Sequence, residues 1–375
     1  MAIVGPAFPL RGGIADFNES LARNLIQEGV EVELFSFSYQ YPEFLFPGKS
    51  QFRENEAPPS DLKIHSCLNS INPFSWFKTA KAIRESEADL VLVRYWMPFM
   101  APALGTLIRL LKSKGVPVIV LADNVIPHES MPLQDQLNAY ILKKADAFLV
   151  MSRSVEKDLK KYLPNPKLLR IPHPIYNVFG EKIEKEKARS SLKIPEGEPW
   201  ILFFGFIRKY KGLHLLLDAM AEPKLKSRGV KLLVAGEFYD ESDSYFDKVE
   251  KLGLKDRVRF DDDFIPTEEV KAYFSATDLV VQPYITATQS GISQIAYQFD
   301  KPMVVTNVGG LGEWIPDTVG YVVEPNPFEV ATAIDDFFEN QRENEMSSAA
   351  AEEKKRFDWK HFTKGVMHLA QDLIQ

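Results

Sequence analysis

The sequence predicts an α/β protein built from two parallel-sheet domains, and three observations support this prediction. Short apolar runs rich in β-branched residues alternate with helical patterns along most of the chain, which is typical of parallel βαβ units. The alternation breaks once, just before residue 175, and resumes at Trp200. At 375 residues the chain is too long for one ordinary core and fits two domains.

The first half of the chain alternates strands and helices throughout. Apolar β-branched runs predict strands at residues 2–4, 32–37, 89–94, 116–122, 147–151 and 168–171. Apolar residues at helical spacing predict helices at residues 14–26, 75–86, 100–114, 133–144 and 152–162. Residues 40–60 interrupt this pattern as a long irregular segment, and long loops in compact domains are often functional.

The loop between the first strand and the first helix contains glycines but is not a dinucleotide fingerprint. Gly5, Gly12 and Gly13 do not have the G-x-G-x-x-G spacing, and the second strand ends in Ser36-Phe37-Ser38 where a ribose-binding acid would be needed. A nicotinamide enzyme is therefore disfavoured. Gly12 and Gly13 are equally consistent with a tight strand-to-helix turn and with a contact to phosphate or sugar.

Polar residues follow the predicted strand 116–122 directly. Asp123 is the first of them, and His128 stands beside Glu129 a few positions later. The carboxyl ends of strands in an open parallel sheet are where ligands bind. Single histidines are more often structural than catalytic, but this position favours a functional role for His128.

The second half repeats the alternation after a charged segment, residues 181–193, that has the composition of a crossing between domains. Strands are predicted at residues 200–204, 231–235, 258–260, 279–282, 303–306 and 321–323. Helices are predicted at residues 213–220, 268–275, 290–299, 330–338 and 358–373.

Two features of the second half predict an anion site. Arg208, Lys209 and Lys211 stand between a strand end and a helix start, where charge-assisted hydrogen bonds and the helix dipole suit a diphosphate. Ser290 and Gly291 begin the predicted helix 290–299, whose first N–H groups attract an anion. The alternative for the cations is a solvated basic turn; the helix start in the same half favours the anion. The strand 303–306 runs into a glycine loop with Glu313, so two strand-end loops face one crevice.

Composition excludes several other classes. The net charge of −7 argues against a dedicated nucleic-acid binder. Cys67 is the only cysteine, so no internal disulfide can form and no Cys/His metal cluster is expected. The single cysteine favours the cytoplasm, and the N-terminus lacks the pattern of a secretion signal. Residues 95–111 come nearest to a membrane segment but contain prolines and an arginine; a packed helix is preferred, and a peripheral membrane contact stays open.

RGGIA near the start, IRKYKG at the opening of the second half and KPMVVTNVGGLGE near its end occur in an order that resembles the GT-B glycosyltransferases of family 4. The resemblance covers nearly the whole chain. It implies two Rossmann-like domains facing a central cleft, with residues 1–174 on the acceptor side and residues 175–357 binding a nucleotide-sugar donor. It also implies that the C-terminal helix, residues 358–375, packs back on the first domain.

The resemblance implies roles for single residues. Lys211 matches the lysine of the family's diphosphate pair, whereas Phe206 stands where the paired arginine is usual, so Arg208 is expected as a shifted substitute. Gly12 and Gly13 match the glycine loop near the donor phosphate and the acceptor. The family's two glutamates fall on Ala287 and Ile295. Contacts to the sugar and the ribose are therefore expected from Thr288, Gln289, Gln294 and Glu313.

The resemblance thus implies transfer of a sugar from a nucleotide-diphosphate sugar to an acceptor hydroxyl with retained configuration, in bacterial polysaccharide or glycoconjugate synthesis. The acceptor is expected to be a carbohydrate or lipid-linked, and the protein cytoplasmic or peripheral at the inner membrane face. Asp123 and His128 are the candidate catalytic residues, and no metal or other cofactor is expected. A nucleotide-sugar epimerase and a nonenzymatic binding or partner protein of the same fold remain alternatives, because both family glutamates are missing.

Overall fold

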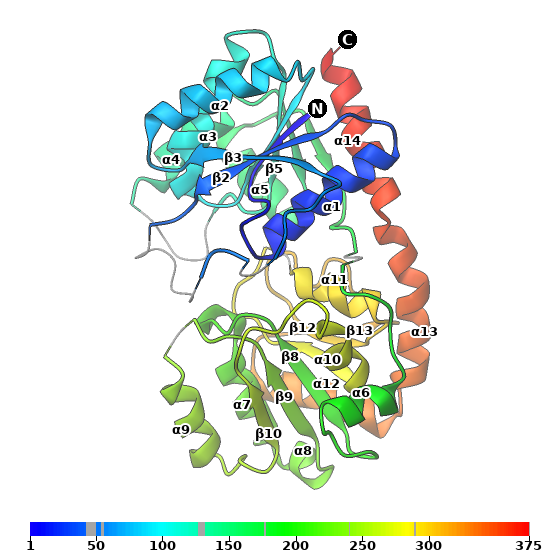
Figure 1. Ribbon diagram of the computed structural model, residues 1–375. Helices are drawn as coiled ribbons and strands as arrows, with labels where there is room; N and C mark the ends of the chain where they lie inside the picture. The colour runs from blue at the N-terminus through cyan, green and yellow to red at the C-terminus, as the bar shows by residue number, and fades with distance from the viewer. Residues whose placement is uncertain are drawn as a thin grey trace. The chain divides into compact units, whose positions relative to one another are not determined.

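The computed structural model describes residues 1–42, 50–53, 56–126, 132–175, 178–239, 241–288 and 290–374. The chain divides into two compact units: unit 1 comprises Met1–Pro174 and Asp358–Gln375, and unit 2 comprises Ile175–Phe357. Each unit contains one parallel sheet with helices packed on it (Figure 1). The predicted α/β class with two parallel-sheet domains is confirmed.

Unit 1 is built on a seven-stranded sheet of order β3-β2-β1-β4-β5-β6-β7, in which every pair of neighbours is parallel. The strand order reverses between β1 and β4, and such reversals place loops on either side of a crevice at the carboxyl ends of the strands. The strands are β1 (Ala2–Val4), β2 (Glu33–Tyr39), β3 (Lys63–Asn69), β4 (Val91–Tyr95), β5 (Val118–Ala122), β6 (Ala147–Val150) and β7 (Leu168–Arg170).

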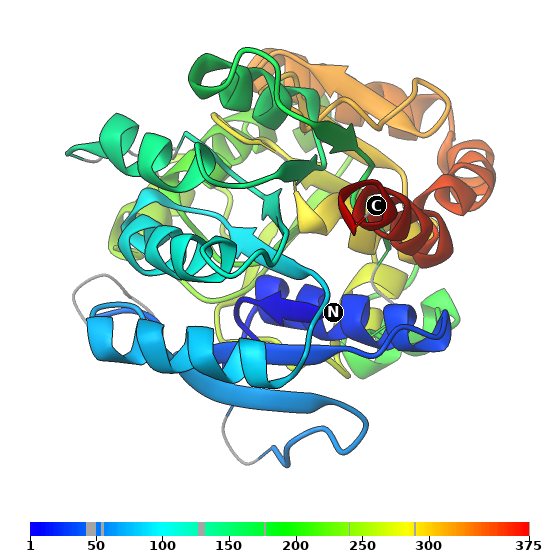
Figure 2. The ribbon, with the colours of Figure 1, turned by 90° about the horizontal axis from the view of Figure 1, so that it is seen from above.

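Helices cover both faces of this sheet. In Figures 1 and 2, α1 and α14 lie on one face, and α2, α3 and α4 lie on the other. Phe17 of α1 packs against Trp359 and Phe362 of α14, with ring centroids 5.1 and 5.5 Å apart. The helices are α1 (Gly13–Gln27), α2 (Pro73–Glu85), η2 (Pro98–Met100), α3 (Ala101–Lys112), α4 (Gln134–Leu142), α5 (Arg153–Tyr162) and α14 (Trp359–Ile374).

One strand of unit 1 was not predicted, and one segment had been given two interpretations. The strand β3 was not predicted, because it lies at the edge of the sheet and carries polar residues such as Lys63 and Ser66 at exposed positions. The segment 95–111 was left open as a membrane contact. The preferred packed helix is confirmed, because α3 begins in this segment and Tyr95, Met100 and Leu107 are fully buried in the core between the sheet and the helices. A membrane contact there stays a prediction.

Unit 2 is built on a six-stranded parallel sheet of order β10-β9-β8-β11-β12-β13. Its strands are β8 (Trp200–Phe204), β9 (Lys231–Ala235), β10 (Val258–Asp261), β11 (Leu279–Gln282), β12 (Met303–Thr306) and β13 (Gly320–Val323). Alternate residues of β8 pack on opposite faces: Ile201 and Phe203 join the core beneath α7 and α12, whereas Phe204 packs against Phe274 of α10.

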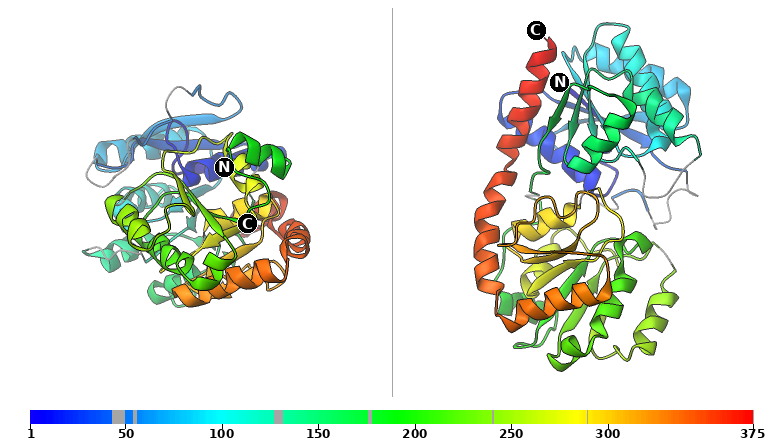
Figure 3. Two further views of the ribbon diagram at one scale, coloured as in Figure 1. Left: turned by 90° about the horizontal axis from the view of Figure 1, so that it is seen from below. Right: turned by 180° about the vertical axis from the view of Figure 1, so that it is seen from behind.

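The helices of unit 2 include several that were not predicted. Residues 181–193 were interpreted as a charged crossing between domains, but they contain α6, which packs on α10 inside the unit. The chain enters unit 2 at Ile175 and leaves it at Phe357, where the Ile175 N–H donates to the Phe357 carbonyl (3.0 Å). The two views of Figure 3 show the helices α6 (Lys185–Ser191), η3 (Lys209–Lys211), α7 (Leu213–Met220), α8 (Pro223–Ser227), α9 (Asp243–Lys251), α10 (Val270–Ala276), α11 (Gly291–Gln298), α12 (Pro327–Glu339), α13 (Glu343–Glu353) and η4 (Lys354–Phe357) from below and from behind.

Candidate functional site

The cationic turn after β8 and the loop after β11 are packed directly together in unit 2. The Ile285 N–H donates to the Tyr210 carbonyl (2.7 Å), which joins the two loops. At Gly212 the backbone has a left-handed φ of 70°, and a Cβ there would lie only 1.9 Å from the Pro283 carbonyl oxygen. Only glycine allows this close approach.

The surroundings of Gly205, which follows β8, locate the Lys211 ammonium relative to the start of α11. A Cβ built on Gly205 would lie 3.3 Å from Lys211 Nζ and 3.2 Å from Ile292 Cδ1. The Lys211 ammonium and the first turn of α11 are therefore neighbours at one spot on unit 2. The structure thus places Lys211 beside the first turn of α11, the helix that Ser290 caps and Gly291 begins. These are three of the residues predicted to bind a diphosphate; the others are Arg208, Gly12 and Gly13.

Ser290 caps α11, as its position in the sequence predicts. Its Oγ accepts from the Ile292 N–H (3.2 Å) and lies 3.3 Å from the Tyr284 hydroxyl. Gly291 is the first residue of the helix. The Ile292 and Ser293 N–H groups donate to Ser290, so the Gly291 N–H and the positive end of the helix dipole remain to attract an anion.

Lys211 carries a buried charge that the described residues do not neutralise. The residue is only 9% exposed, and among the described residues no carboxylate pairs with it. Burial, with a smaller contribution from the nearby Arg208 charge, lowers the pKa of Lys211 to about 7. Its Nζ lies 5.8 Å from the centre of the Tyr284 ring. An anion at this position would relieve the cost of the buried ammonium.

Arg208 lies on an aromatic surface beside Lys211. Its guanidinium carbon is 4.9 Å from the centre of the Tyr239 ring, which in turn packs against Phe206 at 4.5 Å. The aromatic residue at position 206, where the family places an arginine, therefore supports the ring on which Arg208 stacks.

The residues expected to contact sugar and ribose lie in the loops around α11. Thr288 and Glu313 are half-buried, and Gln289 lies outside the described residues. Gln294 is buried on α11, and its Oε1 has no hydrogen-bond partner among the residues that the structure describes. The loop after β12 approaches the loop after β11 so closely that a Cβ at Gly309 would lie 1.5 Å from the Ala287 carbonyl oxygen.

In unit 1, Gly12 and Gly13 lie where the loop after β1 enters α1. Gly12 is the N-cap residue and has a φ of 110°, which favours glycine, whereas a Cβ there would meet open space. The preceding part of the loop is held by side chains: Glu19 accepts from the Phe8 N–H (2.9 Å), and the Asn18 amide donates to the Pro6 carbonyl (2.8 Å).

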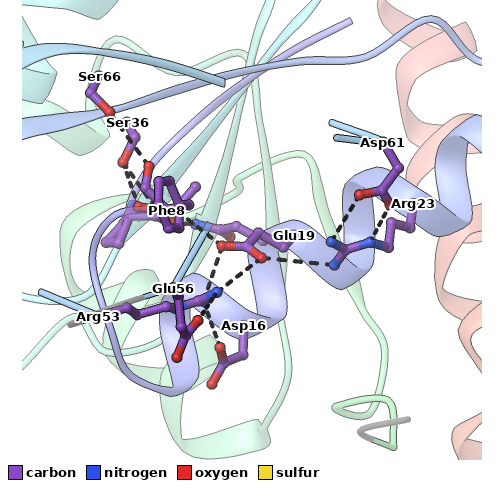
Figure 4. A network of polar contacts seen from close by, with 12 residues as sticks. Phe8, Asp16, Glu19, Arg23, Ser36, Arg53, Glu56, Asp61 and Ser66 are labelled. Carbon is purple, nitrogen blue, oxygen red and sulfur yellow. Dashed lines mark hydrogen bonds and ion pairs between the residues drawn. The ribbon is translucent and has the colours of Figure 1, made fainter. Parts of the chain in front are cut away.

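A network of charged side chains borders this glycine loop (Figure 4). Arg53 donates to Asp16 (2.8 Å) and to Glu19 (3.0 Å), and Arg23 binds Asp61 at the other end (2.6 Å). Burial raises the pKa of Asp16 to about 6, although Arg53 opposes the rise. The network fixes the loop to α1.

Asp123 is buried at the end of β5 and bound by Arg94 of β4. The Nε and Nη2 atoms of Arg94 donate to the two carboxylate oxygens of Asp123, and the guanidinium also stacks on Phe17 at 4.0 Å. Burial raises the pKa of Asp123, and Arg94 opposes this. The ion pair with Arg94 is sufficient to explain why the Asp123 carboxylate is buried, so no bound ligand is needed to explain it. A catalytic role for Asp123 stays a prediction. His128 lies outside the described residues.

Comparisons with known proteins bear on the whole chain. The family model "Glycosyltransferase Family 4" matches residues 11–176, and the model "Glycosyl transferases group 1" matches residues 184–356. The two matches follow the two units of the structure.

The chain is a GT-B glycosyltransferase.

Relatives of this glycosyltransferase match it over nearly its full length. An uncharacterized glycosyltransferase of Methanocaldococcus jannaschii is 29% identical and covers 98% of this chain and 97% of its own. A D-inositol 3-phosphate glycosyltransferase of Corynebacterium diphtheriae is 24% identical, over 93% of this chain and 87% of its own. The structure of Anabaena HepE in complex with UDP has a TM-score of 0.76 at 16% identity and covers 99% of both chains.

Several residues that surround the candidate site residues were not singled out in the sequence. Gly205 follows a buried strand and Gly212 follows a basic turn, and both patterns can be recognised in the sequence. The need for glycine, however, comes from contacts with segments about 80 residues away in the chain. Tyr284 gave no signal, because a tyrosine after a strand is common. Arg94 lies inside an otherwise apolar strand, and its partner Asp123 directly follows the neighbouring strand β5.

The described part of the chain offers no group of three or more His, Cys, Asp or Glu side chains arranged to hold a metal ion. Within the same residues, no helix combines the length and apolar character needed to cross a membrane.

Proposed function

We propose that this glycosyltransferase moves a sugar from a nucleotide-diphosphate sugar to an acceptor hydroxyl, and that unit 2 binds the donor diphosphate between Lys211 and the start of α11. The observation that carries the proposal is the buried Lys211 ammonium, which has no carboxylate partner among the described residues and lies beside Ile292 of that helix. The solved structure of HepE with UDP supports a nucleotide diphosphate as the ligand class.

The proposed site stabilises the charge that develops on the leaving diphosphate. Cleavage of the bond between the anomeric carbon and the diphosphate oxygen leaves negative charge on that oxygen and cationic character on the sugar. Lys211 and the N–H groups at Ser290 and Gly291 are fixed before the reaction, so they stabilise this charge without reorganising. Arg208, held on Tyr239, adds a second positive charge near Lys211. Two cations and a helix dipole suffice for a metal-independent site.

The contacts to sugar and ribose are proposed to come from Thr288, Gln294 and Glu313. The buried Oε1 of Gln294 lacks a partner within the described part of the chain, which suits a hydroxyl group of the donor sugar. Ala287 and Ile295 are buried and apolar where the family places glutamates. We further propose retained anomeric configuration, a carbohydrate or lipid-linked acceptor and a role in polysaccharide or glycoconjugate synthesis. The comparisons give no support to an epimerase.

Titration calorimetry with UDP, GDP and ADP tests the donor site. Lys211→Ala is expected to weaken binding of the preferred nucleotide by about 10- to 100-fold, because a hydrogen bond to a charged group contributes about 1.5 to 3 kcal/mol. Lys209→Ala is the matched control: the same residue type in the same turn, but exposed. Equal affinity of the Lys211→Ala variant and the unsubstituted protein would refute the assignment.

Turnover with a panel of nucleotide sugars tests the reaction. Release of free nucleotide together with a glycosylated acceptor is expected, and NMR of the product reads the anomeric configuration. An epimerised sugar without transfer, or binding without turnover, would contradict the proposal and select one of the alternatives.

A further inference from the structure

A buried polar pair lies between β11 and the first turn of α11. Gln282 is the last residue of β11 and Ser293 is the third residue of α11, and they are 1% and 5% exposed. The Gln282 Nε2 donates to the Ser293 Oγ (3.1 Å), and that hydroxyl donates to the Gln282 Oε1 (3.2 Å). Strands of a sheet that is covered on both faces are normally apolar throughout, so a glutamine in this place needs an explanation.

The stability of the fold does not explain this pair. Replacing both partners of a buried hydrogen bond by apolar groups of the same shape is nearly neutral or stabilising, whereas leaving one partner alone is costly. What a satisfied buried polar pair adds is a single orientation of the elements that carry it. Because neighbouring residues of a helix point about 100° apart, turning α11 by one position would remove the Ser293 hydroxyl from its place opposite Gln282.

The pair lies at the end of α11 that faces the proposed diphosphate. The other end is anchored by apolar packing: Phe299, which follows the helix, stacks on Phe274 of α10 with ring centroids 5.6 Å apart. At the first turn, Ile292 is only partly buried. The hydrogen bonds between Gln282 and Ser293 therefore supply a directional contact that fixes the first turn of the helix on the sheet.

Gln282 also leads directly into the loop that is packed on the cationic turn. Pro283 follows it in the chain, and the Pro283 carbonyl lies against Gly212, the residue after Lys211. The side chain of Gln282 thus fixes α11, while its backbone continues into the loop that contacts the turn. The two groups proposed to bind the diphosphate, the Lys211 ammonium and the Gly291 N–H, are therefore both positioned relative to this one residue.

We propose that Gln282 and Ser293 are positioning residues of the donor site: their hydrogen bonds set the rotation of α11, so that the Gly291 N–H and the Lys211 ammonium bind one diphosphate together. The inference rests on the proposed function, which names the diphosphate as the ligand of this site. Both residues are buried and act through the helix. A binding site needs its groups held to within about 0.5 Å, and the polar pair provides the orientation that apolar packing leaves free.

Calorimetry of the full chain with UDP tests the inference. Q282M/S293A removes both polar partners with little change of volume, and its affinity for UDP is expected to fall by about tenfold. Its midpoint of urea denaturation should stay close to that of the unsubstituted chain, since neither polar partner is left unpaired. S293A alone is the second variant for the case that the double variant does not fold, and it should bind UDP at least about threefold more weakly.

A mutant cycle with Lys211 separates positioning from a general loss of structure. In the K211A background, Q282M/S293A should weaken UDP binding by less than about threefold, because the ammonium with which α11 must be aligned is already gone. T277V is the matched control just before the amino end of β11. It removes a buried hydroxyl that donates to the Tyr273 carbonyl (3.0 Å), and it should leave the affinity for UDP unchanged.

Unchanged affinity for UDP in the folded variants, or equal losses with and without Lys211, would overturn the inference. A loss of the same size in T277V would do so too, since any buried polar group would then affect the site. Failure of the proposed function is a different result, which K211A alone reports: if K211A binds UDP as well as the unsubstituted chain does, the donor site itself is wrong. If K211A weakens binding and Q282M/S293A does not, only the positioning role is wrong.

Discussion

Lys211 shows how one buried charge can make donor binding depend on pH. The pKa of this ammonium in the free protein is lowered to about 7 by burial, and a bound diphosphate would favour the charged form. The affinity for UDP should therefore be highest well below pH 7, where Lys211 is charged without the ligand. Above pH 7 the affinity should fall by about tenfold for each pH unit.

The measurement is calorimetry with UDP across this range. UDP itself titrates near neutral pH, so the decisive quantity is the affinity of the unsubstituted protein relative to that of Lys211→Ala, which lacks the ammonium. A ratio that stays constant between pH 6 and 9 would show that Lys211 does not bind the diphosphate.

Arg94 and Asp123 illustrate a second consequence of burial at the residue scale. Arg94→Met would leave the Asp123 carboxylate buried without its partner, and we expect a loss of about 3 to 5 kcal/mol in the free energy of unfolding. Urea denaturation measures this loss. The double variant R94M/D123L removes both charges and should recover most of the stability. Failure of the double variant to recover would show that Asp123 interacts with further groups.

At the scale of elements, Gly212 controls how the β8 and β11 loops meet. Gly212→Ala would place a Cβ against the Pro283 carbonyl and force the two loops apart, so the affinity for UDP should fall by about tenfold or more. Gly229→Ala is the matched control, since Gly229 has a φ of 71°, nearly that of Gly212 at 70°, but open space around it. Equal losses of UDP affinity in both variants would mean that only backbone strain matters.

The elements also show which parts of the fold the sequence can predict. The buried strands of both sheets were predicted from their apolar runs, because helices cover both faces of those strands. The helix α11 was predicted from the helical spacing of its apolar residues. The edge strand β3 was missed because half of its residues face solvent. The helix α9 was missed because its apolar face is narrow: only Tyr245 and Val249 are buried.

The sequence predicted the separate segments of the candidate site but not which of their side chains lie close together. The basic turn and the cap at Ser290 are local patterns, so the sequence revealed them. The Lys211 ammonium is buried beside Ile292 because β8 and β11 are neighbours in the sheet. About 75 residues separate these two strands, so the sequence did not reveal this contact. Nor could the sequence indicate that Arg94 occupies both oxygens of Asp123, since that pair forms between adjacent strands.

At the scale of the whole molecule, the two units should unfold as separate transitions. Trp359 of α14 is buried against Phe17 in unit 1, so Trp359→Ala should lower the free energy of unfolding of that unit by about 3 to 5 kcal/mol. In scanning calorimetry, UDP is expected to raise the transition of unit 2, and Trp359→Ala should lower the other one. A variant that lowers only the transition that UDP raises would contradict this assignment.

The return of α14 to unit 1 also has a consequence during synthesis. The aromatic surface of α1 around Phe17 is covered by Trp359 and Phe362, which leave the ribosome only after all of unit 2 has been translated. The N-terminal unit therefore cannot complete its core in the usual vectorial order. Until the last helix emerges, a nascent chain exposes this aromatic surface, which is the kind of segment that chaperones bind.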